Sequence, residues 1–164
     1  WVDESTLPDP DNAKSKILLE AEEQVLASGF PAIIFRLAGI YGPGRNRLSS
    51  FRSGKETPVQ QDYYMNMIHR HDIVNAVPVL FKKAVEGSVY LGVDDEPVLY
   101  SEFSNWLNKK LGRPASCLEL KKSSPGGKRC SNRRLKELGV KLQYPTYREG
   151  YEALISKEMP LGLG

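Results

Sequence analysis

The chain has 164 residues, 40% of them hydrophobic, which is enough to bury the core of a globular unit. It holds no run of about eighteen apolar residues and no amino-terminal signal pattern, so we expect no membrane partner and a cytoplasmic location. The net charge of +3 is too small to require a polyanionic partner. The first residue is Trp1, not methionine, which leaves open a processed chain or a piece of a longer one.

The first half of the chain predicts a helix followed by a strand. Apolar residues recur at helical spacing from Asn12 to about Ser28, and Gly29 is a natural left-handed stop. Residues 32–37 form an apolar run broken only by Arg36, which is typical of a strand buried on both faces of a parallel sheet. A charge inside a strand needs a partner, so we favour a structural ion pair for Arg36 over catalysis.

The second half continues this alternation of strands and helices. Short strands are predicted at residues 64–68 and 89–93, and helices at the capping residues Asp72 and Ser101. Residues 146–149 have the form of a capping box ahead of a last helix. Alternating helices and strands favour the α/β class.

A loop rich in glycine and proline follows the strand at residues 32–37. In open α/β sheets, ligands bind just beyond the carboxyl ends of the strands, so this loop is the first place to look for function. It is not a complete dinucleotide-binding turn, because Gly39, Gly42 and Gly44 lead into a proline loop and no helix follows with the third glycine. The alternative is an ordinary strand-exit turn.

Seven stretches of the chain match, in order, the pattern of one family. They are residues 2–10, the helix from Asn12, and residues 36–45, 66–76, 92–97, 128–135 and 144–150. On these motifs the chain resembles the carboxyl-terminal half of extended or atypical short-chain dehydrogenase/reductases, the NAD-dependent epimerase/dehydratase group.

The resemblance implies an α/β fold made of two parts. Residues 1–92 would form the C-terminal part of a Rossmann-type parallel sheet. Residues 93–164 would form a small α+β substrate-binding subdomain, to which residues 45–65 also contribute. The first strands and the glycine-rich turn that grips the cofactor pyrophosphate would lie upstream of Trp1.

In that family, a tyrosine and a lysine four residues later share the face of a helix that lines the cleft. The tyrosine is the general acid/base, and the lysine holds the nicotinamide ribose and lowers the tyrosine pKa. Lys16 stands at the lysine position, whereas the tyrosine position holds Asn12. An amide has no proton to exchange near neutral pH, so Asn12 can orient a group but cannot replace a phenol. Either another acid/base works here, or the protein binds cofactor without reductase activity; alternatively, Lys16 is only a solvated lysine.

The cofactor implied by the resemblance is NAD or NADP. Leu37, Ala38, Gly39 and Ile40 would line its nicotinamide end, largely through backbone and apolar contacts. The preference between the two cofactors is not encoded in these residues.

Substrate contacts are implied for Gly39, Arg45, His69 and Arg129. Gly39 stands where sugar-nucleotide epimerases usually place an asparagine, which makes a nucleotide sugar a less expected substrate. His69 either closes the substrate cleft or satisfies loop backbone. With His71 it supplies too few ligands for a metal site, and no metal is expected.

The remaining features are a basic run and two cysteines. The run allows an anion site at the start of a short helix opened by Ser131, or merely a solvated loop; it lacks the interleaved aromatic residues of a nucleic-acid surface. Its members are Lys121, Lys122, Lys128, Arg129, Arg133, Arg134 and Lys136. Cys117 and Cys130 lack metal-ligand spacing and are predicted to be reduced thiols.

Three functional hypotheses follow. The first is an NAD(P)-dependent epimerase/dehydratase-like oxidoreductase acting on a small or sugar-type hydroxyl or carbonyl substrate. The second is a catalytically silent cofactor-binding or partner-binding module on the same scaffold, which the residue at position 12 motivates. The third is a fragment without activity of its own. The expected partners are a small-molecule substrate and the dinucleotide, and a homodimer is left open.

Overall fold

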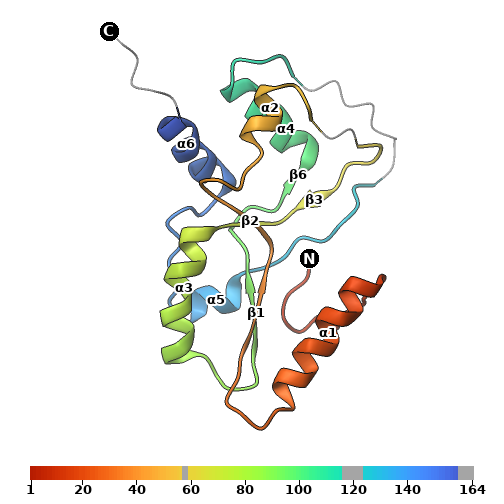
Figure 1. The fold of residues 1–164 in the computed structure, drawn as a ribbon, viewed down its shortest axis with the longest axis vertical. Coiled ribbons are helices and arrows are strands. Elements are labelled where there is room, and N and C mark those ends of the chain that lie inside the picture. The colour runs from red at the N-terminus through yellow and green to blue at the C-terminus, as the bar shows by residue number, and fades with distance from the viewer. Residues whose placement is uncertain (57–58, 116–123, 159–164) are drawn as a thin grey trace.

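The strands of the protein pair two by two (Figure 1). The computed structural model describes residues 1–56, 59–115 and 124–158. The pairs are β1 (Ile34–Leu37) parallel to β5 (Val89–Gly92), β2 (Gly39–Tyr41) parallel to β4 (Met67–His69), and β3 (Tyr64–Met65) antiparallel to β6 (Val98–Leu99). Helices separate the parallel partners along the chain, so the predicted α/β class is confirmed.

The helices surround these strands. They are α1 (Ala13–Leu26), α2 (Leu48–Arg52), α3 (Arg70–Lys83), α4 (Tyr100–Lys110), α5 (Arg133–Glu137) and α6 (Tyr147–Glu158). Among the described helices, none is both long and apolar enough to cross a lipid bilayer.

β1 and β2 form one extended stretch that changes partner at Ala38. The Ala38 N–H donates to the Gly92 carbonyl at 3.0 Å, whereas the Gly39 N–H donates to the Asn66 carbonyl at 3.0 Å. The stretch therefore passes from β5 to β4 without a turn. The loop predicted to follow directly after residue 37 begins only at Gly42, after β2. In the same way, the single strand predicted at residues 64–68 is divided at Asn66 into β3 and β4.

The core is made of two hydrophobic clusters. The larger one joins α2, α4 and α6 to β3 and β6 in the upper part of Figure 1. Its fully buried members include Phe51, Phe103, Tyr147 and Tyr151. The smaller cluster joins α3, β5 and α5 around Tyr90 in the lower part of the view. Phe103 and its half-buried neighbour Trp106 pack in the larger cluster, as their helical spacing predicts.

α1 forms as predicted but buries little. The Asn12 side chain caps it, because its Oδ1 accepts a hydrogen bond from the Ser15 N–H at 2.9 Å. No residue of α1 is buried, and Ile17 is 63% exposed. The prediction that the strand at 32–37 is buried on both faces is wrong, since Leu37 is 39% exposed. In the described parts of the chain, β1 pairs along one edge only.

The predicted ion pair of Arg36 is confirmed. Its guanidinium donates to both carboxylate oxygens of Glu22, with the shortest contact at 2.6 Å from Nη2 to Oε2. Because Glu22 belongs to α1 and Arg36 to β1, this pair ties the helix to the strand. The charge inside the strand is thereby satisfied.

Two of the predicted helix caps are wrong. α3 begins one turn earlier than expected, because His69 caps it: its Nδ1 accepts from the His71 N–H at 3.2 Å. Asp72 instead lies in the first turn, buried, and accepts from the backbone N–H groups of Gln143 (2.6 Å) and Tyr144 (3.2 Å). A carboxylate read as a local cap thus anchors a loop about seventy residues away.

The N-cap of α4 is Leu99, and a distant side chain holds the first turn of the helix. Ser101 lies inside the helix, and its N–H donates to Asp62 Oδ1 at 3.1 Å while its hydroxyl donates to Oδ2 at 2.5 Å. The capping box at the start of α6 is confirmed: the Arg148 N–H donates to Thr146 Oγ1, and the Thr146 N–H donates to Glu149 Oε2 at 3.0 Å.

The amino-terminal segment is bound to residues 129–131 and to β5. The Val2 N–H donates to the Arg129 carbonyl (2.9 Å), and the Ser131 N–H donates to the Val2 carbonyl (3.0 Å). Glu4 Oε1 accepts from the Leu91 N–H of β5 at 2.9 Å. Next to this bridge, Cys130 is a free thiol, as predicted. Cys117 lies outside the described residues.

Candidate functional site

A cavity of about 420 Å³ lies beside β2. Its walls come from β2, from the loop that follows the carboxyl end of β2, from the segment around β3, and from α6. The lining residues are Gly39, Ile40, Tyr41, Arg45, Asn46, Arg47, Tyr63, Tyr64, Met65, Asn66, Met67 and Tyr151. Two of them are arginines and none is acidic, so the lining carries a net positive charge.

Tyr41 presents its ring to this cavity and buries its hydroxyl elsewhere. The ring stacks on that of Tyr151, with centroids 5.0 Å apart and an interplanar angle of 12°, and meets His69 edge-on at 5.1 Å. A Cβ added at Gly150 would lie 2.7 Å from the ring carbons Cε2 and Cζ of Tyr41 and closer still to its hydroxyl oxygen. The hydroxyl therefore points into α6, and burial, with help from the Asp94 carboxyl, raises its pKa far above the usual value. Tyr41 cannot donate a proton to a molecule in the cavity.

The two asparagines of the lining are oriented by backbone. Asn46 Nδ2 donates to the Gly42 carbonyl (3.1 Å), and Asn46 Oδ1 accepts from the Leu48 N–H (2.9 Å). Asn66 Nδ2 donates to the Lys128 carbonyl (2.7 Å), and its Oδ1 accepts from the Cys130 N–H (2.8 Å). Each amide is fixed by these two bonds and keeps one further N–H.

The arginines keep most of their donors available. Arg45 uses its Nε to donate to the Ile40 carbonyl at 3.2 Å. The Arg47 guanidinium lies over the ring of Tyr100, 5.8 Å from its centroid. Within the described residues, neither arginine pairs with a carboxylate. Tyr151 forms the back wall of the cavity, and burial raises the pKa of its hydroxyl to about 12.

The structure brings only some of the sequence-predicted residues together. Gly39, Ile40 and Arg45 line the cavity. Arg129 reaches its wall indirectly, with its guanidinium 5.0 Å from the ring centroids of both Tyr64 and Trp1.

The other predicted residues lie outside the cavity lining. Leu37 and Ala38 directly precede it along the chain. His69 is 2% exposed and supports Tyr41 from behind; its burial lowers its pKa to about 4. Asn12 and Lys16 lie at the start of α1, and both polar atoms of the Asn12 amide are occupied, by Ser15 and by Asp11.

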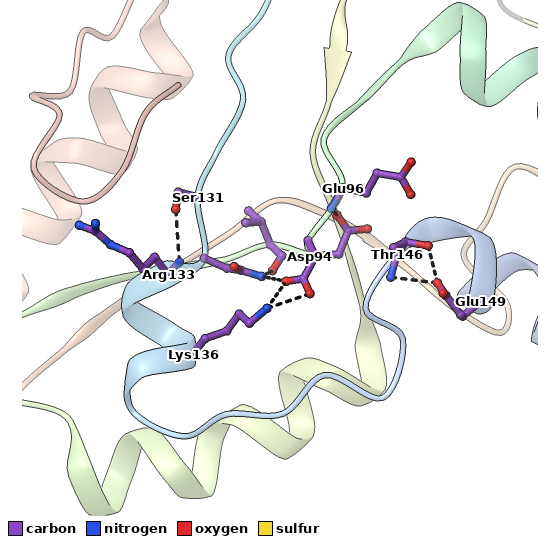
Figure 2. Close-up of polar contacts among 10 residues, drawn as sticks. Asp94, Glu96, Ser131, Arg133, Lys136, Thr146 and Glu149 are labelled. Carbon is purple, nitrogen blue, oxygen red and sulfur yellow. Dashed lines mark hydrogen bonds and ion pairs between the residues drawn. The ribbon is translucent and has the colours of Figure 1, made fainter.

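Asp94 is a buried acid that the sequence interpretation missed. It follows the carboxyl end of β5 and is 2% exposed (Figure 2). Its Oδ1 accepts from the Glu96 N–H at 3.2 Å, whereas Oδ2 has no hydrogen-bond partner in the described part of the chain. Burial raises its pKa to about 8. An acidic residue directly after a buried strand was the available signal.

The basic run is partly neutralised by acids. Lys136 donates to both carboxylate oxygens of Asp95, at 2.9 and 3.1 Å, and Arg133 pairs with Glu137 at 3.6 Å. Asn132 is buried and donates to Asp95 Oδ1 at 2.6 Å (Figure 2). These contacts favour the structural interpretation of this segment over an anion site.

Comparison with known proteins shows which proteins this chain resembles. The chain is 34% identical to a conserved protein of unknown function from Silicibacter pomeroyi, with a TM-score of 0.84 over 96% of this chain and 60% of that one. It is 31% identical to a protein from Methylobacillus flagellatus described as an NAD-dependent epimerase/dehydratase, with a TM-score of 0.81 over 96% and 57%. The chain is similar in sequence and fold to proteins described in these terms, over less than two thirds of their length. It resembles them in the described α/β fold and in the parallel pairing of its strands.

Other comparisons are consistent with this family. Protein YeeZ of Escherichia coli K12 is 28% identical over 146 residues, which are 88% of this chain and 53% of that protein. The structure of MoeE5 in complex with UDP-glucuronic acid and NAD shares the fold at 21% identity, with a TM-score of 0.74 over 96% of this chain and 60% of that chain. The chain thus spans between half and three fifths of these relatives. No protein-family model matches it.

Proposed function

We propose that this chain is the substrate-binding portion of an NAD(P)-dependent oxidoreductase of the epimerase/dehydratase type. Its substrate is a small or sugar-type molecule with a hydroxyl or carbonyl group, and the cavity beside β2 is the place where it binds. The observation that carries the proposal is the position of this cavity, at a parallel strand and the loop after its carboxyl end, where α/β sheets bind ligands. The likeness to the Methylobacillus protein supports the choice of chemistry.

The cofactor is NAD or NADP, whose nicotinamide accepts or supplies a hydride. Its nicotinamide end lies along Leu37, Ala38, Gly39 and Ile40. The exposure of Leu37 and the absence of a side chain at Gly39 leave this edge accessible. Lys16 donates to a hydroxyl of the nicotinamide ribose.

The pyrophosphate end of the cofactor is held by residues outside 1–164. Among the described residues, the only helix that follows a parallel strand directly is α3, and the turn that leads into it contains no glycine. A dinucleotide turn needs glycine there so that the backbone can approach the pyrophosphate. The span of this chain, 60% of the Silicibacter protein, is consistent with such a division. Residues 1–92 complete the cofactor domain, and residues 93–164 with 45–65 form the substrate subdomain.

The substrate side uses Gly39 and Arg45 directly. A Cβ at Gly39 would lie 3.1 Å from the Asn66 carbonyl, so a side chain at this position would need the neighbouring backbone to shift. Arg129 shapes the wall through Tyr64. His69, neutral near pH 7, supports the wall from behind. Asn12 orients the start of α1 and transfers no proton.

The proposal also includes the location of the protein and its oligomeric state. We place the protein in the cytoplasm, where a soluble dinucleotide is available. A homodimer would cover the exposed apolar side chains of α1, such as Ile17 and Leu18. Light scattering on the purified protein measures its oligomeric state.

Titration with NADH and NADPH tests the proposal. The chain of residues 1–164 should bind neither appreciably, and a chain extended upstream should bind one of them. Lys16→Ala in the extended chain should weaken that binding, and Lys14→Ala, two residues away, should not. Tight binding to the short chain would contradict the division of the cofactor site.

The silent-module alternative rests on position 12. Asn12→Tyr in the extended chain restores the phenol four residues before Lys16. A rise in reductase turnover supports an enzyme whose geometry is otherwise intact. Cofactor binding without turnover in either form favours a catalytically silent protein.

A further inference from the structure

The charged side chains that line the cavity are all cationic. Asn46 and Asn66 each make two hydrogen bonds to backbone, which fix their amides and leave each a second, neutral N–H, and the hydroxyl of Tyr41 points into α6. The guanidinium donors of Arg45 and Arg47 are therefore the charged groups that the lining offers a ligand, beside neutral amide and tyrosine groups.

No acid competes for these arginines at the cavity. The lining holds no aspartate or glutamate, and in the part of the chain that the structure describes neither Arg45 nor Arg47 forms an ion pair. Unpaired guanidinium groups beside a partly enclosed space favour an anion, and the planar fork of arginine suits a carboxylate or phosphate.

The rest of the lining is apolar and flat. Tyr63 stacks on Tyr100, with centroids 5.4 Å apart and an interplanar angle of 10°, and the aromatic rings of Tyr41 and Tyr64 contribute further walls. Met65 and Met67 are buried and border the same space. Thioethers and tyrosine rings pack well against a planar ligand.

The volume of the cavity limits the class of ligand further. About 420 Å³ lies near the lower end of the roughly 300–1,000 Å³ that ligand pockets occupy. A ring with one acidic group suits this space better than a base, two sugars and a diphosphate together.

We propose that the substrate is a small molecule with a planar apolar body and a single acidic group, bound by Arg45 and Arg47. This inference rests on the proposed function for its site and deepens it by naming the substrate class. Arg45 and Arg47 set specificity: Arg45 approaches from the loop after β2, and Arg47 approaches from the start of α2. Tyr63 and Tyr64 flank the planar body.

Calorimetric titration of residues 1–164 tests this without any cofactor, because every lining residue belongs to this chain. The probes are benzoate, phenyl phosphate, the neutral benzyl alcohol, and UDP-glucose. We expect benzoate or phenyl phosphate to bind, with an affinity that falls as salt is added, and benzyl alcohol to bind at least about tenfold more weakly. Whichever of the two anions binds more tightly shows whether the acidic group of the substrate is a carboxylate or a phosphate. In methyl NMR, the Met65 and Met67 signals should shift with the bound probe.

Substitutions assign the binding to the two arginines. Arg45→Gln with Arg47→Gln should weaken binding of the anion at least about tenfold, whereas Arg45→Lys with Arg47→Lys should retain much of it. Arg133→Gln removes the same charge away from the cavity and should have no effect. Circular dichroism confirms that each variant is folded.

Several results would overturn this inference. They are equal binding of benzyl alcohol and benzoate, unchanged affinity in the double glutamine variant, and tighter binding of UDP-glucose than of both small anions. An extended chain that binds nicotinamide cofactor while failing these tests keeps the proposed function and removes only the substrate class. If both the short and the extended chain bind the anions but no dinucleotide, the substrate class stands and the proposed oxidoreductase function falls.

Discussion

The stability of the protein should fall between pH 6.5 and pH 8, and Asp94 should cause the fall. Its carboxyl is 2% exposed, its Oδ2 lacks a partner among the described residues, and the buried hydroxyls of Tyr41 and Tyr147 nearby are also unpaired. Burial raises its pKa from 3.8 to about 8 in the folded protein. Between these values the folded state holds a proton that the unfolded chain has lost, so stability decreases as pH rises.

The size of the fall follows from the pKa difference. Each pH unit in this window removes roughly 1.4 kcal/mol from the free energy of unfolding. Below pH 6.5 a second group acts in the opposite direction: His69, whose pKa burial lowers from 6.5 to about 4, loses stability as pH falls. Above pH 6.5 His69 no longer offsets Asp94. We therefore expect the free energy of unfolding to fall by about 2 kcal/mol between pH 6.5 and pH 8, which lowers the melting temperature by about 4–8 °C.

The test is Asp94→Asn, followed by thermal and urea unfolding at pH 6.5 and pH 8. The amide keeps the shape of the side chain and an oxygen to accept from the Glu96 N–H, but it cannot ionise. The variant should melt at nearly the same temperature at both values. Asp95→Asn, a matched change at the next and exposed residue, should leave the pH dependence in place. A pH dependence unchanged by Asp94→Asn would refute the reasoning.

Three further changes test the packing around the site and the attachment of α1. Gly150→Ala forces a methyl group into Tyr41 and should cost about 3 kcal/mol in urea unfolding, because a well-packed site cannot absorb it. Tyr41→Phe removes a buried hydroxyl without a partner in the described residues and keeps the ring, so the free energy of unfolding should not fall. Glu22→Gln breaks the ion pair with Arg36 and should cost about 1 kcal/mol, and hydrogen exchange should become faster throughout α1.

Controls and contrary outcomes are available for each change. Gly126→Ala meets no atom closer than 3.8 Å and should be tolerated, and equal losses at both glycines would argue against the described packing. A clear loss of stability in Tyr41→Phe would mean that the hydroxyl has a partner. Unchanged exchange in α1 of Glu22→Gln would show that other contacts hold this helix, and Glu20→Gln on the same helix serves as its control.

Local signals in the sequence predicted much of the fold. The helix that starts near Asn12, the capping box at Thr146 and the buried strand around Tyr90 depend on a few neighbouring residues, and all three form as expected. The partner of Arg36 followed from the cost of a lone charge in a strand.

Contacts between segments that lie far apart along the chain could not be predicted from patterns of neighbouring residues. Asp72 looks like a helix cap in sequence, but its partners are the backbone of residues 143 and 144. The first turn of α4 is held by Asp62, which lies far from it along the chain. The change of strand partner at Ala38 likewise depends on where β4 and β5 lie, and not on the residue itself.

The candidate site shows the same division. Gly39, Ile40 and Arg45 were implied by the family resemblance, and the cavity includes them. Arg47, two residues further, was missed. Tyr151 joins the cavity only because α6 packs against β2, which no pattern near residue 151 could indicate.

The bridge between Val2 and residues 129–131 has a practical consequence for protein engineering. It brings the amino terminus into the middle of the molecule in Figure 1, with the Trp1 ring against Arg129, whose other neighbour is the cavity residue Tyr64. Any segment joined ahead of Trp1, whether more of a longer chain or an affinity tag, would therefore leave from this junction beside the cavity wall.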